Sequence, residues 1–254
     1  MWFELILTAD GEKMNFGESA FMSLIYALLF GGLASLLVKI TAAKLPDLLI
    51  AQWRAEANSL LEISTEAESE VCLERYCKVR YLFILLSAVF LTFCAVYVFG
   101  FSVQGVGYTV FGLLLLVLSV IDFETRLLPD IVVLPALWLG IAANSFGLFI
   151  DCFDSVWGAI AGYLFLWSVH QAFQYVTGRQ ALGRGDMKLM AAIGAFGGWE
   201  IIGNTVLFAS VTALLATVLR NIFLPADAKD QNLAFGPYLA IGGWISALIH
   251  FARY

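Results

Sequence analysis

The sequence predicts an all-α fold: a polytopic integral membrane bundle of about eight transmembrane helices. Of the 254 residues, 61% are apolar and only 13% are charged, a composition that water-soluble domains do not show. The apolar residues are also gathered in long charge-poor runs. Most of these runs reach the roughly 17–25 residues that a helix needs to cross a hydrocarbon core. The lipid bilayer is therefore the first partner that we expect.

The charge balance excludes a second class of partner. The formal net charge is −6, and the chain contains no basic run and no stripe of basic and aromatic residues. Proteins that bind nucleic acids neutralise phosphates with clustered Lys and Arg side chains. We therefore expect no nucleic-acid binding.

The first expected span covers Ala20–Val38. Acidic residues precede it, whereas a cleavable signal peptide would be basic there, so we expect a permanent span. Residues 39–80 then carry charges throughout, and their apolar residues have the spacing of an amphipathic helix. The chain therefore divides into an N-terminal tail with the first transmembrane helix (residues 1–38), a cytoplasmic loop or subdomain (39–80) and a transmembrane domain (81–254).

The transmembrane domain contains seven further charge-poor runs, which are Tyr81–Phe99, Gly105–Ile121, Ile131–Ile150, Val156–Val176, Leu189–Trp199, Ile201–Leu219 and Leu233–Phe251. The run Leu189–Trp199 is too short to cross a bilayer unless its helix begins at Asp186 and continues past Trp199. Small residues four positions apart recur at Gly158 and Gly162 and again at Gly194 and Gly198. This spacing is typical of helices that pack closely against each other in lipid.

The basic residues predict how the helices are oriented. With the N-terminus outside and eight alternating spans, twelve of the fourteen Lys and Arg residues fall on the cytoplasmic side. Only Lys13 and Arg253 fall on the other side. This positive-inside bias supports the count of eight spans, and the same topology places Asp122 and Asp186 together on the cytoplasmic side.

Asp122 and Asp186 are the candidate reactive residues. Asp122 ends an apolar run, where the helix dipole disfavours a negative charge, so a simple capping role explains it poorly. Asp186 follows Gly183 and Gly185, which permit positive φ and close approach of another chain, although this tetrapeptide alone could also be a turn with a helix-capping Asp. Ionisable groups at a membrane boundary indicate a function. Two carboxylates from separate helices indicate an acid/base pair that activates water.

Five other polar residues receive weaker interpretations. Asp130 follows Pro129 at the start of a run, which is typical of a helix N-cap. Lys188 could bias the protonation of Asp186 or pair with a lipid phosphate. His170 and Gln174 share one face of the fifth run, either lining a hydrated cavity or forming a hydrogen-bonded packing pair. We expect Glu200, at the opposite membrane boundary, to be solvated.

The cysteines do not predict a metal site. Cys72 and Cys77 are separated by four residues, whereas zinc ribbons favour two, and no second pair or nearby His completes a ligand set. No nucleotide-type glycine motif is present either. We therefore expect neither a metal nor another cofactor.

Three motifs resemble those of type IV prepilin peptidases. The segment from Asp122 to Asp130, which ends Leu-Pro-Asp, is similar to the first catalytic segment of that family. Residues 183–188, Gly-Arg-Gly-Asp-Met-Lys, are similar to its Gly-x-Gly-Asp-x-Lys motif, and residues 234–240 resemble its Phe-Gly-Pro-Tyr segment before the last span. Other Gly-x-Gly-Asp membrane proteases share the second motif, but the Leu-Pro-Asp segment favours the prepilin group. In order and spacing the resemblance covers the chain from about Tyr81 to the C-terminus.

The resemblance implies a multi-pass aspartic endopeptidase, a hydrolase of the bacterial inner membrane, with a periplasmic N-terminus and an active site facing the cytoplasm. It would cleave the leader of a type IV prepilin or pseudopilin, a step in type IV pilus assembly or protein secretion, and residues 81–254 would form the peptidase domain. Asp122 and Asp186 match the two catalytic aspartates of the family. Gly183, Gly185 and Lys188 match motif positions to which no catalysis is assigned.

The N-terminal third departs from the family pattern. Many members carry two Cys-x-x-Cys pairs in the first cytoplasmic loop and also N-methylate the new N-terminus of the product. Cys72 and Cys77 do not have this spacing, and the stretch around Ser35 lacks the Asn of the first-span motif. N-methylation therefore lies outside what the motifs imply.

Two other functions are compatible with paired membrane acids. A proton-coupled transporter would use Asp122 and Asp186 as a proton relay. A non-catalytic scaffold of a pilus or secretion machine would use them only structurally.

Overall fold

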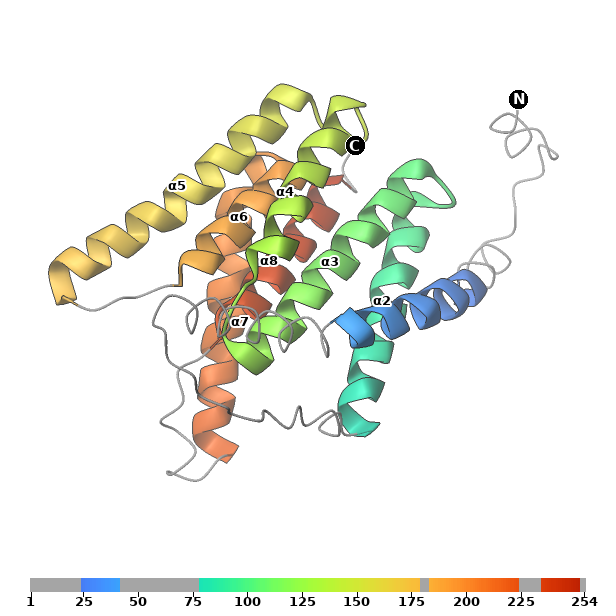
Figure 1. Cartoon of the computed structure of the whole chain (residues 1–254), viewed down its shortest axis with the longest axis horizontal. Coiled ribbons are helices and arrows are strands. Elements are labelled where there is room, and N and C mark those ends of the chain that lie inside the picture. The colour runs from blue at the N-terminus through green and yellow to red at the C-terminus, as the bar shows by residue number, and fades with distance from the viewer. Residues whose placement is uncertain (1–23, 42–77, 179–182, 224–233, 252–254) are drawn as a thin grey trace, which may run out of the picture.

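The computed structural model describes residues 24–41, 78–178, 183–223 and 234–251, and all regular structure in these ranges is helical. The helices are Leu24–Thr41, α2 (Lys78–Phe99), α3 (Val103–Thr125), α4 (Asp130–Ser145), α5 (Cys152–Thr177), α6 (Arg184–Gly197), α7 (Glu200–Phe223) and α8 (Gly236–Phe251). The predicted all-α bundle with eight helices is thereby confirmed (Figure 1).

Five of these helices are long and apolar enough to cross a membrane, namely Leu24–Thr41, α2, α3, α5 and α7. The chain is therefore a polytopic helical membrane protein, as the runs predicted. The other three helices are shorter, with 16 residues in α4, 14 in α6 and 16 in α8. The sidedness inferred from the basic residues stays a prediction, as does the division at residues 38 and 80.

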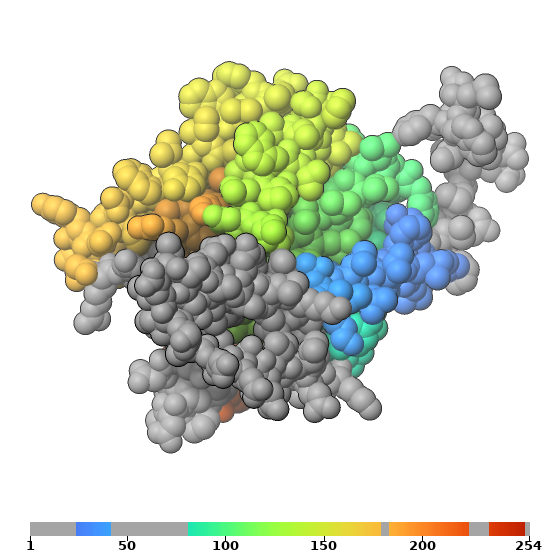
Figure 2. Space-filling model, in the orientation of Figure 1, coloured from blue at the N-terminus to red at the C-terminus, as the bar shows by residue number. Residues whose placement is uncertain are grey.

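Helix α6 lies at the centre of the bundle. Every residue from Asp186 to Gly197 is buried except Lys188, and the helix packs against α4, α5, α7 and α8. In Figure 2, α4 and α5 cover most of α6, of which only a small part is visible. The condition under which this run could cross a bilayer, a helix that continues past Trp199, is not met, because α6 ends at Gly197. Protein surrounds it on several sides, so it does not need the length of a lipid-exposed span.

Helix α4 also ends earlier than the apolar run Ile131–Ile150 predicted, at Ser145. The cause is the buried side chain of Asn144. Its Nδ2 donates to two carbonyl oxygens near the end of α6, at 2.9 and 3.1 Å. Its Oδ1 accepts the backbone N–H groups of Phe149 and Ile150, at 3.2 and 3.3 Å. These bonds turn the chain away from the helix axis and satisfy polar groups that would otherwise be buried unpaired.

Glycines bring α5 and α6 into backbone contact, as their spacing predicted. A Cβ atom added to Gly158 would overlap the carbonyl oxygen of Gly194, and one added to Gly194 would overlap that of Gly158. One turn further along, a Cβ on Gly162 would lie 2.7 Å from the carbonyl oxygen of Met190. This contact fixes the depth of α6, and therefore of Asp186 at its first turn.

We expect Gly194→Ala to destabilise the protein, because the added methyl group meets backbone that cannot move aside. The cost of such overpacking is about 1–3 kcal/mol. Gly203 on α7 is the matched control, because a Cβ there has no atom within 4 Å. In detergent, thermal unfolding should show a lower Tm for Gly194→Ala and an unchanged or higher Tm for Gly203→Ala. Equal Tm values for both variants would contradict the close α5–α6 contact.

Candidate active site

Asp122 lies in the last turn of α3 and is 5% exposed. Its Oδ2 accepts the backbone N–H of Gly236, the first residue of α8, at 3.0 Å. The first N–H groups of a helix have no partner within the helix, so this bond satisfies both an amide and a buried carboxylate. Asp122 therefore connects the end of α3 to the start of α8.

Asp186 lies in the first turn of α6 and is 7% exposed. Its Oδ2 accepts the backbone N–H of Gly183, at 3.2 Å, and so closes the first turn of the helix. Negative charge is also favoured at this end of a helix. The helix-capping interpretation of Asp186 is thus confirmed. In both aspartates Oδ2 accepts the hydrogen bond from the backbone N–H group, and Oδ1 takes no part in that bond.

The two aspartates meet at one end of the bundle, as the predicted topology required. The Asp122 carboxylate lies close enough to Asp186 to act on it electrostatically. The two residues are 64 positions apart and come from different helices. Aspartic proteases activate water with two interacting carboxylates, and the arrangement of Asp122 and Asp186 is compatible with that chemistry. The catalytic role of each aspartate stays a prediction at this point.

The two motif glycines do not act as expected. The φ of Gly183 is −70°, and neither glycine is among the positive-φ glycines of the described chain, so positive φ is not their reason. A Cβ on Gly185 would lie 2.7 Å from the Cβ of Leu128, in the segment that joins α3 to α4. The clearance at Gly185 therefore admits a neighbouring part of this same chain.

Lys188 pairs with a residue that neither interpretation named. Its Nζ donates to both carboxylate oxygens of Asp130, at 2.6 and 2.7 Å. Asp130 is the first residue of α4, while Pro129 holds the N-cap position, so the N-cap interpretation of Asp130 is wrong by one residue. Asp130 belongs to the surroundings of the site, and no spacing rule in the sequence could pair it with Lys188.

Gly236 is a further site residue that sequence reasoning did not select. Besides donating its N–H, it lies so close to Asp122 that a Cβ there would be 2.5 Å from Oδ2 and 2.9 Å from Cγ. The available signal was the Gly-Pro pair at the start of the last apolar run. A glycine in the first turn of a helix permits a close approach to its N-terminus.

His170 lies on α5 and is 9% exposed, whereas Gln174 is exposed. Among the described residues, the buried Nδ1 of His170 has no hydrogen-bond partner. The interpretation of these two residues as a hydrogen-bonded packing pair is therefore wrong.

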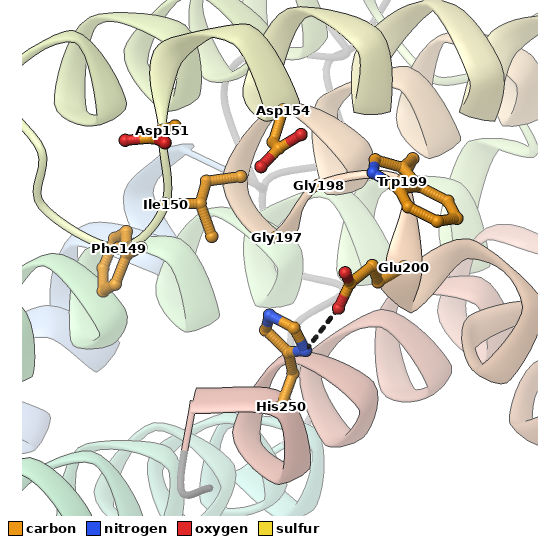
Figure 3. Close-up of a pocket in the computed structure, with 9 residues that line it drawn as sticks. All are labelled: Phe149, Ile150, Asp151, Asp154, Gly197, Gly198, Trp199, Glu200 and His250. Carbon is orange, nitrogen blue, oxygen red and sulfur yellow. Dashed lines mark ion pairs between the residues drawn. The ribbon is translucent and has the colours of Figure 1, made fainter. Parts of the chain in front are cut away.

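A polar pocket of about 180 Å³ lies at the opposite end of α6 from Asp186 (Figure 3). Asp151 and Asp154 line it from the start of α5, and Glu200 and His250 line it from α7 and α8. The Oε2 of Glu200 is 3.6 Å from Nδ1 of His250, and the Glu200 side chain is 50% exposed, which agrees with its expected solvation. Within the described ranges, no group of three or more His, Cys, Asp or Glu residues could hold a metal ion.

Two of the four cysteines can be placed. Cys94 and Cys152 are free thiols. Cys72 and Cys77 lie outside the described residues, together with most of the expected cytoplasmic loop.

We expect Gly236→Ala to lower the free energy of unfolding because its methyl group meets the Asp122 carboxylate. The same change should cost less in an Asp122→Ala background, where the carboxylate is absent. Residues in direct contact show coupling energies of about 0.5–3 kcal/mol. Thermal unfolding of the four proteins of this double-mutant cycle, in detergent, measures the coupling. Additive effects would contradict the contact between Asp122 and the start of α8.

Comparison with known proteins identifies a family. Residues 109–218, which include Asp122 and Asp186, match the type IV leader peptidase family. A prepilin leader peptidase/N-methyltransferase of Pseudomonas putida is 34% identical over 87% of this chain and 89% of its own length.

Proteins of the same name from Stutzerimonas stutzeri and Pectobacterium carotovorum subsp. carotovorum are 44% and 50% identical. Their matches cover 66% and 51% of this chain and only 58% and 46% of the relatives' own lengths. No solved structure matches the chain. The extent of the Pseudomonas putida match, with the family match around both aspartates, shows that the chain belongs to the type IV leader peptidase family.

Proposed function

We propose that this chain is a membrane-embedded aspartic endopeptidase that cleaves the leader peptide of type IV prepilins or pseudopilins. The observation that carries the proposal is the pair of buried aspartates, Asp122 and Asp186, brought together from two helix ends inside the matched region. The names of the relatives support the substrate class. The enzyme resides in the bacterial inner membrane, and its site faces the cytoplasm if the positive-inside orientation holds.

In the proposed mechanism one carboxylate is ionised and the other is protonated. The ionised group takes a proton from water while the water oxygen attacks the scissile carbonyl carbon, and the protonated group gives its proton to the carbonyl oxygen. A tetrahedral diol results. When the C–N bond breaks, the diol returns one proton to the pair and the pair protonates the leaving nitrogen, which restores the starting state.

The hydrogen bonds of the site prepare the carboxylates for this chemistry. The N–H groups of Gly236 and Gly183 each hold one Oδ2, so the two side chains are fixed before substrate binds. Reacting groups that are fixed in advance gain rate because they lose less freedom in the transition state. The Oδ1 atoms stay available for water and for the scissile carbonyl.

The proposal covers cleavage and does not extend to N-methylation. The printed names of the relatives include an N-methyltransferase activity. In this chain Cys72 and Cys77 lack the Cys-x-x-Cys spacing and Ser35 lacks the neighbouring Asn. Mass spectrometry of the cleaved product, made with S-adenosylmethionine present, is expected to show a free, unmethylated N-terminus.

We expect Asp122→Asn and Asp186→Asn each to lower kcat at least about a hundredfold, because an amide can neither take nor give the proton. The measurement is cleavage of a purified prepilin by the purified protein in detergent. Asp154→Asn, at the opposite end of α6, is the matched control and should retain full activity.

Other outcomes identify other functions. Full activity in either Asn variant would overturn the aspartic mechanism. Proton-dependent solute flux in proteoliposomes without cleavage would favour a transporter, and inactivity in both assays would favour a scaffold.

The pH dependence of cleavage should be bell-shaped. At low pH both carboxylates are protonated and the base is lost, whereas at high pH both are ionised and the acid is lost. Because the groups interact, the two limbs report apparent pKa values of the pair. When kcat/KM is measured against pH, the parent and Asp154→Asn should give the same bell-shaped profile. A profile with a single limb would contradict the two-carboxylate mechanism.

A further inference from the structure

The ion pair between Asp130 and Lys188 joins the two segments that carry the aspartates. Asp130 is the first residue of α4, and a connection of only four residues, 126–129, separates it from the end of α3. Lys188 lies on the first turns of α6, two residues after Asp186. Its Nζ reaches both oxygens of the Asp130 carboxylate, at 2.6 and 2.7 Å.

A second contact joins the same two segments. Leu128 packs directly over Gly185, where no side chain fits. The connection itself is fixed by Thr125, whose Oγ1 donates to the carbonyl of Ile121 at 2.8 Å and accepts the N–H of Leu127 at 3.3 Å. The segment 125–130 is thus held at both ends. A displacement of Asp130 would therefore also displace the end of α3, which carries Asp122.

The geometry does not suit Lys188 as a direct electrostatic partner of Asp186. Residues two positions apart on a helix do not face each other. The bidentate bond to Asp130 also compensates the charge of the ammonium group. Nor does the pair suit a role in global stability, because its side chains are 32% and 56% exposed and exposed ion pairs contribute little.

We infer that Asp130 and Lys188 form a positioning clamp, which holds the α3–α4 connection against the start of α6 and thereby sets the spacing of Asp122 and Asp186. This inference rests on the proposed function and deepens it. Neither residue takes part in the chemical step. A small displacement of reacting groups costs rate much more than it costs binding, so the clamp acts on kcat.

The test compares Asp130→Asn, Lys188→Gln, the double variant, and the charge-swapped pair Asp130→Lys/Lys188→Asp in prepilin cleavage. Each single variant should lower kcat about tenfold and leave KM within about twofold. The double variant should be no worse than either single one, because both changes remove the same interaction. The charge-swapped pair should recover most of kcat.

The pH profile separates a clamp from electrostatic tuning. Asp130→Asn removes a negative charge near the site, and Lys188→Gln removes a positive one. Tuning would shift the pH optimum in opposite directions in the two variants, and that result would overturn the inference. A clamp lowers kcat in both and leaves the optimum in place.

A readout that does not depend on activity tests the geometry. Hydrogen exchange followed by mass spectrometry should show faster exchange in residues 130–133 and 183–188 of Asp130→Asn and Lys188→Gln, with other helices unchanged. Glu200→Gln is the matched control, because the Glu200 carboxylate also lies beside a basic side chain, His250, and is similarly exposed, at the far end of α6. It should alter neither kcat nor exchange at these residues.

The outcomes separate this inference from the proposed function. Unchanged kcat, or unchanged exchange at both segments, in the single variants would overturn the clamp while cleavage by the parent still supports the peptidase. If the parent does not cleave prepilin, the proposed function fails, and exchange alone decides whether the pair holds the two segments together.

Discussion

The hydrogen bond from the Gly236 N–H to Asp122 is the interaction on which the site depends. A carboxylate buried among apolar helices costs several kcal/mol without a donor, and the first amide of α8 is a donor that needs an acceptor. The bond spans 114 positions of the chain and fixes the end of α3 against the start of α8. Asp122 is therefore both a structural group and the candidate reactive group, so changes at Gly236 must affect folding and chemistry together.

The second aspartate depends on packing instead. α6 is enclosed by other helices, and the mutual backbone contact of Gly158 and Gly194 leaves it no freedom to slide along α5. Close-packed interiors transmit displacement with little loss. The first turn of α6 is consequently placed by contacts two turns and more away from it. A site built this way keeps Asp186 at a fixed depth.

The sequence was sufficient where a residue's own neighbours decide its structure, and insufficient where distant contacts decide it. Charge-poor runs located the eight helices of the described ranges, and the cost of an acid at a membrane boundary singled out Asp122 and Asp186. The sequence did not predict the end of α4, because Asn144 forms hydrogen bonds with α6 that no local sequence pattern predicts. The partner of Lys188 was missed for the same reason.

The two aspartates also occupy more similar electrostatic positions than their helices suggest. Asp122 lies at the end of α3, where the dipole disfavours negative charge, and Asp186 at the start of α6, where it is favoured. However, the carboxylate of Asp122 meets the first amide of α8, so it too accepts an N–H from a helix N-terminus. Each carboxylate thus receives one such donor through Oδ2. Because the two carboxylates interact, a shared proton belongs to the pair, and titration would report the pair rather than either residue.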